Sequence, residues 1–283
     1  MQMKELTSMK VGFIGAGNMA SAIIKGMIAT AFVPAEQVLV TDHSPDKLQA
    51  FTEATGTVAC STSEELAAQA DVVVIAVKPN QFETLLTPLR DTLQRHRPLI
   101  VSIAAGVTLA QLEAMIGAAP ALPIVRVMPN VNAVIGASMS AVAGNQAAAK
   151  DEIQLVLDMF NAVGMAMELD EEKFSIFIGI AGSSPAYAYL FIDALARGAL
   201  KAGMSKEQAT RIAAQAVLGS AKMVLESDEA PWVLIDKVCS PGGTTIAGLC
   251  KLEDEGFSST VVKGVEATIA KDQEMLRSAE AKR

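Results

Sequence analysis

Residues 10–20 read Lys10-Val11-Gly12-Phe13-Ile14-Gly15-Ala16-Gly17-Asn18-Met19-Ala20. A short apolar strand here runs through a glycine turn into a helical pattern, the order of elements found in dinucleotide-binding folds. Gly15 permits the tight turn, Gly17 leaves room for a pyrophosphate, and Ala20 lets helix and strand pack closely. A glycine turn can also be merely structural, but this context favours a dinucleotide site. The predicted cofactor-binding residues in this stretch are Gly15, Ala16, Gly17, Asn18 and Met19.

Further short apolar runs, rich in β-branched residues, follow at residues 38–41, 71–77, 99–103 and 124–128. Such runs are typical of parallel strands buried on both faces, and helical patterns lie between several of them. From residue 171 the strand-like runs give way to helical patterns. Helices are expected near residues 172–178, 185–202, 206–226, 231–238, 245–255 and 259–279. We therefore predict an α/β fold, with a Rossmann-type NAD(P)-binding domain at residues 1–170 and an all-helical domain at residues 171–283.

The end of the second strand carries Asp42, His43 and Ser44, where the adenosine ribose of a dinucleotide is expected. An aspartate here favours NAD, because it accepts from ribose hydroxyls and repels a 2′-phosphate. His43 and Ser44 can donate to that phosphate and favour NADP. Ser44 followed by Pro45 also fits a helix N-cap, and His43 also fits a plain loop residue. The expected cofactor is NADPH, with NADH as a usable second, and His43 and Ser44 are predicted to bind it.

Loops at the carboxyl ends of parallel strands carry the ligand contacts in such sheets. Several residues there have an equally ordinary alternative: Ser63 belongs to a capping-box pattern at residues 62–65, Lys78 suits a solvated loop, and Asn130 suits a turn. The small residues at 104–106 are suited to lying beside a flat ring. The further predicted cofactor-binding residues are Ser63, Ala76, Val77, Lys78, Pro79, Ala104, Ala105, Gly106 and Asn130.

Composition narrows the function classes. A net charge of -8 over 283 residues argues against a nucleic-acid partner. The 3 cysteines are far apart and lack metal-ligand spacing, so no metal site is predicted, and a reducing cytoplasm fits. The first nine residues are too polar for a signal peptide, and no apolar run is expected to be long enough to span a bilayer. With 51% hydrophobic residues, the excess apolar surface is expected in a core or in an interface between identical subunits.

A second motif, Ser240-Pro241-Gly242-Gly243-Thr244-Thr245, precedes an apolar helical pattern. Proline and glycines bend the backbone, and the next helix begins with free N–H groups and hydroxyls. Such a helix start attracts a small anion, and we interpret it as the seat of a substrate carboxylate, although a turn with an ordinary N-cap is the simpler alternative. The helical half contains no histidine. An imine substrate therefore fits better than a carbonyl, since a protonated imine needs only hydride and an orienting hydrogen bond.

Six runs of residues resemble, in this order, the motifs of the pyrroline-5-carboxylate reductase family. They are residues 15–20, 76–79 (Ala-Val-Lys-Pro), 102–108 (Ser-Ile-Ala-Ala-Gly-Val-Thr), 128–130 (Met-Pro-Asn), 182–187 (Gly-Ser-Ser-Pro-Ala-Tyr) and 236–246 (Asp-Lys-Val-Cys-Ser-Pro-Gly-Gly-Thr-Thr-Ile). The resemblance covers about residues 11–274. It implies the last step of proline biosynthesis, in which NAD(P)H reduces the cyclic imine 1-pyrroline-5-carboxylate to proline. It also implies that the helical domain binds substrate and interlocks two subunits, often in a ring of five dimers.

The resemblance assigns the substrate site to the second motif. It puts the substrate carboxylate on Ser240 and on the amides of residues 243–245, with the Thr245 hydroxyl near the imine nitrogen. The implied catalytic residue is Thr245, and the implied substrate-binding residues are Ser240, Gly242, Gly243, Thr244 and Thr245.

The chain departs from the family pattern at two places: Val131 and Asn132 replace a common Thr-Pro, and Asp42 is unusual at its position. The residues also allow two other functions. A catalytically idle sensor or scaffold would not need to keep the substrate turn intact. A related imine or 3-hydroxyacid reductase would need a lysine placed as an acid in the helical domain, and none is evident.

Overall fold

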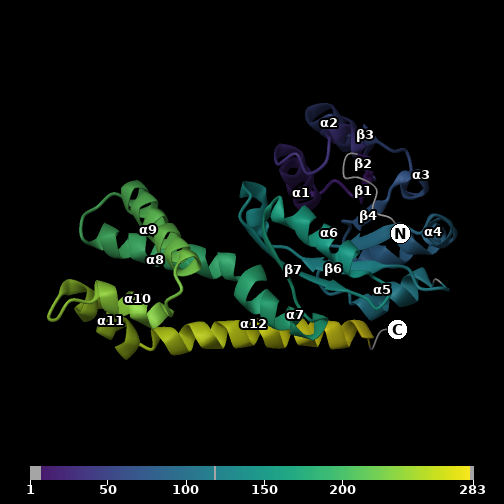
Figure 1. Ribbon diagram of the computed structural model, residues 1–283. Coiled ribbons are helices and arrows are strands. Elements are labelled where there is room, and N and C mark those ends of the chain that lie inside the picture. The colour runs from purple at the N-terminus through teal and green to yellow at the C-terminus, as the bar shows by residue number, and fades with distance from the viewer. Residues whose placement is uncertain (1–7, 118, 281–283) are drawn as a thin grey trace. The chain divides into compact units, whose positions relative to one another are not determined.

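The computed structural model describes residues 8–117 and 119–280, and the chain divides into two compact units. The first unit extends to Gly182 and includes the end of the chain from Ile269, and the second comprises Ser183–Thr268. Figure 1 shows the helices and strands of both units.

The first unit is built on an eight-stranded sheet with the order β3-β2-β1-β4-β5-β6-β7-β8. Neighbouring strands are parallel except β6 and β7, which are antiparallel. The strands are β1 (Val11–Ile14), β2 (Val38–Thr41), β3 (Val58–Ala59), β4 (Val72–Ile75), β5 (Leu99–Ser102), β6 (Ile124–Met128), β7 (Ser138–Gly144) and β8 (Gly164–Glu168). The predicted Rossmann-type α/β fold is confirmed, and the two-residue strand β3 is an element that the sequence did not reveal.

Helices cover both faces of this sheet (Figure 1). Residues of the central strands alternate between two cores: Val73 and Ile75 of β4 lie in the core on one face of the sheet, whereas Val72 and Val74 lie in the core on the other face. The helices of this unit are α1 (Asn18–Ala29), α2 (Pro45–Thr55), α3 (Ser63–Gln69), α4 (Phe82–His96), α5 (Leu109–Ile116), α6 (Lys150–Asn161) and α7 (Phe174–Phe177). Shorter turns are η1 (Ala35–Gln37), η2 (Pro79–Gln81), η3 (Val131–Ile135), η4 (Glu171–Lys173) and the π-turn η5 (Ile178–Gly182).

The second unit is helical throughout its regular structure. It contains α8 (Ser184–Lys201), α9 (Lys206–Glu226), α10 (Pro231–Val238), α11 (Thr244–Asp254) and the first half of α12 (Phe257–Glu280), up to Thr268. These bounds lie within two residues of the helices expected from the sequence. The boundary predicted at residues 170 and 171 stays a prediction, since the two compact units do not by themselves separate a cofactor-binding part from a dimerisation part.

One buried cation anchors the start of the helical half. Arg126 on β6 is 2% exposed, and its Nη1 lies 2.8 Å from Glu171 Oε1. Its guanidinium carbon lies 4.6 Å from the centroid of the Phe174 ring. The same Glu171 oxygen accepts a hydrogen bond from the Leu109 N–H at the start of α5, at 2.8 Å. The pair thus fixes η4 against the sheet, because a buried charge must keep its partner.

The segment from η4 to α8, Glu171–Lys201, is one helical stretch that contains the π-turn and a bend at Ser183. By length and composition alone it is apolar enough to cross a membrane, with 28% of its most apolar window buried. The expectation that no apolar run reaches this length was therefore wrong. Gly182 and Pro185 read as breaks between two helices, but a π-turn joins them into one.

We expect Glu171→Ala to lower the free energy of unfolding by about 3 kcal/mol, since it leaves Arg126 charged, buried and without its carboxylate. The expected loss lies at the low end of the usual range because the Glu171 side chain is 26% exposed. Chemical denaturation measures it. Glu172→Ala is the matched control, because Glu172 is exposed on the same turn and should change stability by less than about 0.5 kcal/mol. Equal losses for both variants would contradict an anchoring role for the buried pair.

Candidate active site: a cofactor cleft and a substrate turn

A cleft of about 620 Å³ opens beside the carboxyl ends of β1, β2 and β4 in the first unit. This is where an open parallel sheet binds its ligands. Small-molecule and cofactor sites have volumes of roughly 300 to 1,000 Å³. The structure brings together in the lining of this cleft seven of the predicted cofactor-binding residues: Gly15, Gly17, His43, Ser63, Ala76, Val77 and Lys78.

The glycine turn has the geometry that a pyrophosphate needs. Gly15 has a φ of +104°, and a Cβ there would lie 2.8 Å from the Ala76 carbonyl oxygen, so another residue would be strained. At Gly17 a Cβ would meet nothing within 4 Å, which leaves open space beside the backbone. Helix α1 begins directly after Gly17 with no side-chain cap and no acidic residue in its first turn. Its first N–H groups are therefore suited to an anion, and the turn fits a dinucleotide phosphate.

Asp42 supports the glycine turn from the end of β2. One carboxylate oxygen accepts from the Ala16 N–H at 2.8 Å, and the other accepts from the Ser44 N–H at 2.9 Å and lies 3.1 Å from His43 Nδ1. The Asp42 side chain is only 10% exposed. Both oxygens therefore hold the protein's own backbone, a role that the sequence alone did not distinguish from a ribose contact.

The other predicted cofactor-binding residues lie outside the lining of this cleft: Ala16, Asn18, Met19, Ser44, Pro79, Ala104, Ala105, Gly106 and Asn130. Ser44 occupies the N-cap position of α2, but its side chain makes no capping hydrogen bond. Its hydroxyl is therefore not used in the way that the simpler interpretation supposed. Gly106 has a φ of +76° with open space around its missing Cβ, which agrees with a position beside a ligand.

The sequence missed several polar residues of the cleft, namely Thr41, Ser61, Thr62, Asn80, Gln81 and Thr84. Ser61 and Thr62 follow β3, and that strand is too short to leave a pattern. The run of three hydroxyl residues at 61–63 was the available signal. It was interpreted as a capping box, and Thr62 does accept from the Glu65 N–H at 3.1 Å.

The substrate motif forms a tight turn in the second unit, between α10 and α11. The Gly243 N–H donates to the Ser240 carbonyl oxygen at 2.9 Å, and Gly242 has a φ of +69°, as the third residue of a type II turn does. Helix α11 then begins at Thr244, with no side-chain cap at Gly243 and no acidic residue in its first turn. Because the Gly243 amide closes the turn, the amides of Thr244 and Thr245 are the ones suited to an anion.

The lysine nearest to this turn is already paired. Lys237 in the last turn of α10 forms an ion pair with Glu229, which precedes that helix. The Glu229 backbone N–H in turn donates to Ser227 Oγ at 3.1 Å. An exposed ion pair therefore links the two ends of α10, and Lys237 is not free to act as an acid at the turn.

Two protein-family models match the chain. Residues 171–275 match the model described as pyrroline-5-carboxylate reductase dimerisation. Residues 10–106 match the model described as NADP oxidoreductase, coenzyme F420-dependent. The first match covers the helical half that supports self-association, and the second covers the glycine turn and the cleft.

Relatives and solved structures match almost the whole chain. The pyrroline-5-carboxylate reductase of Escherichia coli (strain K12) is 41% identical over 95% of this chain and 99% of its own length. That of Arabidopsis thaliana is 38% identical over 96% and 97%. A pyrroline-5-carboxylate reductase structure from Coxiella burnetii superposes with a TM-score of 0.90 at 34% identity, covering 95% of this chain and 99% of that one. A Plasmodium falciparum pyrroline carboxylate reductase structure with NADP bound superposes with a TM-score of 0.83 at 33% identity, covering 95% of this chain and 99% of that one.

Gly17→Val should weaken NADPH binding by about tenfold or more, because the added side chain enters the open space at the turn. Its backbone has a φ of -68°, which valine tolerates, so the melting temperature should hardly change. Isothermal titration measures the affinity. Gly15→Ala is the contrasting variant, since its positive φ and close carbonyl should lower the melting temperature itself. Wild-type affinity in Gly17→Val would place the phosphates elsewhere.

Proposed function

The chain belongs to the pyrroline-5-carboxylate reductase family, and from this premise we propose how its two units share the NAD(P)H-dependent reduction of 1-pyrroline-5-carboxylate to proline. The observation that carries the proposal is the uncapped start of α11 behind the Ser240–Gly243 turn, in a chain that also holds an open glycine turn. One arrangement suits a small carboxylate and the other suits a dinucleotide.

The first unit takes the cofactor. The N–H groups at the start of α1, beside the open space at Gly17, would hold the cofactor phosphates. A nicotinamide bound there supplies the hydride. Asp42 keeps the Ala16 amide in place, while His43 and Ser44 face a 2′-phosphate, so NADPH is the expected first choice and NADH the second. The NADP in the Plasmodium falciparum structure supports this order.

The second unit takes the substrate. Ser240 and the amides of Thr244 and Thr245 hold its carboxylate, with Gly242 and Gly243 shaping the turn. The Thr245 hydroxyl lies one residue into α11 and orients the ring nitrogen of the imine by a hydrogen bond. A protonated imine is already electrophilic at carbon. The protein therefore needs only to orient it for hydride transfer and need not deliver a proton.

The second unit also makes the chain a dimer. Within its described residues, the buried apolar side chains are Pro185, Ala196, Ala209 and Ala213, and none of them is large. Helices α10 and α11 bury none of their residues, whereas Leu190 and Leu225 are 71% and 73% exposed. A unit without large buried side chains cannot offset its own chain entropy, so a second copy must cover these faces.

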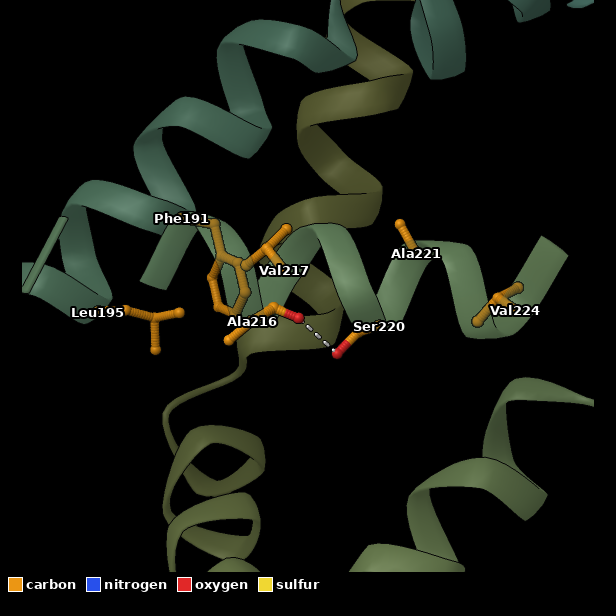
Figure 2. Close-up of a pocket in the computed structure, with 7 residues that line it drawn as sticks. All are labelled: Phe191, Leu195, Ala216, Val217, Ser220, Ala221 and Val224. Atoms are coloured by element: carbon orange, nitrogen blue, oxygen red, sulfur yellow. Dashed lines mark hydrogen bonds between the residues drawn. The ribbon is translucent and has the colours of Figure 1, made fainter. Parts of the chain in front are cut away.

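A groove between α8 and α9 is part of this surface (Figure 2). Figure 2 shows Phe191 and Leu195 of α8 beside Ala216, Val217, Ser220, Ala221 and Val224 of α9. The groove is almost wholly apolar, and its Ser220 hydroxyl is used internally, donating to the Ala216 carbonyl oxygen at 3.0 Å. Helices of a second copy fill it in the proposed dimer.

Several wider assignments follow from the family. We place the enzyme in the cytoplasm and arrange its dimers in a ring. The apolar helix Glu171–Lys201 serves the interface between subunits rather than a membrane. The division between cofactor-binding and dimerising parts is placed at residue 170, where the matching dimerisation model begins one residue later.

Thr245→Ala should lower kcat/KM for 1-pyrroline-5-carboxylate by about ten- to a thousandfold, because one orienting hydrogen bond to the imine is lost. NADPH affinity should hardly change, since the cofactor cleft lies in the other unit. Steady-state oxidation of NADPH and of NADH with this substrate tests both the function and the residue.

Thr245→Ser is the matched control and should recover much of the lost rate, because it keeps the hydroxyl. A Thr245→Ala enzyme with a lower melting temperature but normal turnover would show that Thr245 serves only the helix start, worth about 1 kcal/mol. A wild-type enzyme inactive on this substrate with both cofactors would refute the function itself.

Ala221→Glu should dissociate the dimer or prevent the chain from folding, because it places a charge in the apolar groove. Light scattering at micromolar concentration measures the mass. Arg95→Glu, on an exposed position of α4 in the first unit, is the control and should leave the mass unchanged. A stable, folded wild-type monomer would contradict the proposal.

A further inference from the structure

The helix that leads out of the first unit carries a proline one turn after its π-turn. Pro185 has no N–H, so the carbonyl four residues earlier, on Ala181, lacks the donor that an α-helix would provide. Ala181 is buried, and a buried carbonyl without a partner destabilises the fold. The missing hydrogen bond must therefore come from elsewhere in the protein.

Asn130 supplies it. Its Nδ2 donates to the Ala181 carbonyl oxygen at 3.0 Å, across 51 positions of sequence. Its Oδ1 accepts from the Asn132 N–H at 3.1 Å and so caps η3, and its own N–H donates to Ser138 Oγ at 3.2 Å. The side chain is buried and is engaged at both ends of its amide. One residue thus joins the loop after β6 to the π-turn.

The same strand holds the other end of this segment. Arg126 of β6 pairs with Glu171 at the start of η4, eleven residues before the π-turn ends. Met128 of β6 also comes close to the π-turn, with its Cε 3.6 Å from where a Cβ on Gly182 would lie. Residues 171–182 are therefore fixed at both ends by β6 and the loop that follows it.

We propose that Asn130 is a positioning residue for hydride transfer, which replaces the hydrogen bond that Pro185 cannot make and so fixes the π-turn leading into the substrate-binding unit. The inference rests on the proposed function, because it takes cofactor and substrate to be held by different units. Hydride transfer is sensitive to small misplacements of the reacting atoms. Loosening the π-turn therefore lowers kcat and leaves cofactor binding intact, in contrast to the cofactor contact that the sequence suggested for Asn130.

A double-mutant cycle tests the proposal. Asn130→Asp keeps the size and the acceptor for Asn132 but loses the donor to Ala181, and Asn130→Ala removes both. Pro185→Ala restores an N–H that can reach the Ala181 carbonyl. We expect either change at Asn130 to lower kcat about ten- to a hundredfold with the Kd for NADPH unchanged. In the Pro185→Ala background the same changes should cost about threefold or less, because the carbonyl has regained a donor.

Each alternative outcome overturns the inference. Weaker NADPH binding with an unchanged kcat would make Asn130 a cofactor ligand. Equal losses in both backgrounds would show that the bond to Ala181 is not the source of the effect. Thermal unfolding measures the same coupling without substrate. A change at Asn130 should lower the melting temperature less in the Pro185→Ala background than in the wild-type background. An inactive wild-type enzyme that still shows this thermal coupling would refute the proposed function alone, whereas absent coupling would refute the role of Asn130.

Discussion

Among its described residues, the second unit buries only Pro185 and three alanines as apolar side chains, and its need for a partner follows from this deficit. Hydrophobic burial is the main favourable term in folding, so helices α8 to α11 need a second copy to be stable. The turn proposed to hold the substrate, Ser240–Gly243, lies between α10 and α11. Its geometry therefore depends on assembly as well as on the local bend, whereas the cofactor turn rests on a sheet that is covered on both faces within one chain.

The two turns proposed to hold cofactor and substrate have similar backbone geometry but are stabilised by different contacts. In each, glycine permits the bend and an uncapped helix start offers N–H groups to an anion. The cofactor turn is held by the Asp42 carboxylate, reaching the Ala16 N–H from the end of β2. The substrate turn is held by its own backbone bond from Gly243 to Ser240. Helix starts without acidic residues suit both tasks, because a carboxylate in the first turn would compete with the ligand for the amides.

Local patterns predicted most of the fold. Buried β-branched runs located the parallel strands, and the motif around Gly15 predicted a cleft that the structure places at the ends of β1, β2 and β4. What the sequence could not predict depends on long-range contacts. Arg126 looked like one polar residue in a strand, yet it is buried against Glu171, 45 positions away. Likewise, the two residues of β3 pair only because β2 lies beside them, and with β3 the hydroxyls of Ser61 and Thr62 enter the cleft.

The π-turn shows where prediction from local pattern ends. Pro185 and Gly182 predict a break between helices, and proline does remove a backbone donor. Whether the chain breaks or continues depends on whether the freed carbonyl finds another donor, since a buried one without a partner is costly. Asn130 provides that donor from a loop 51 positions earlier, and the helix continues from Glu171 to Lys201. A local rule thus identifies the unsatisfied group, and only the tertiary structure identifies the residue that satisfies it.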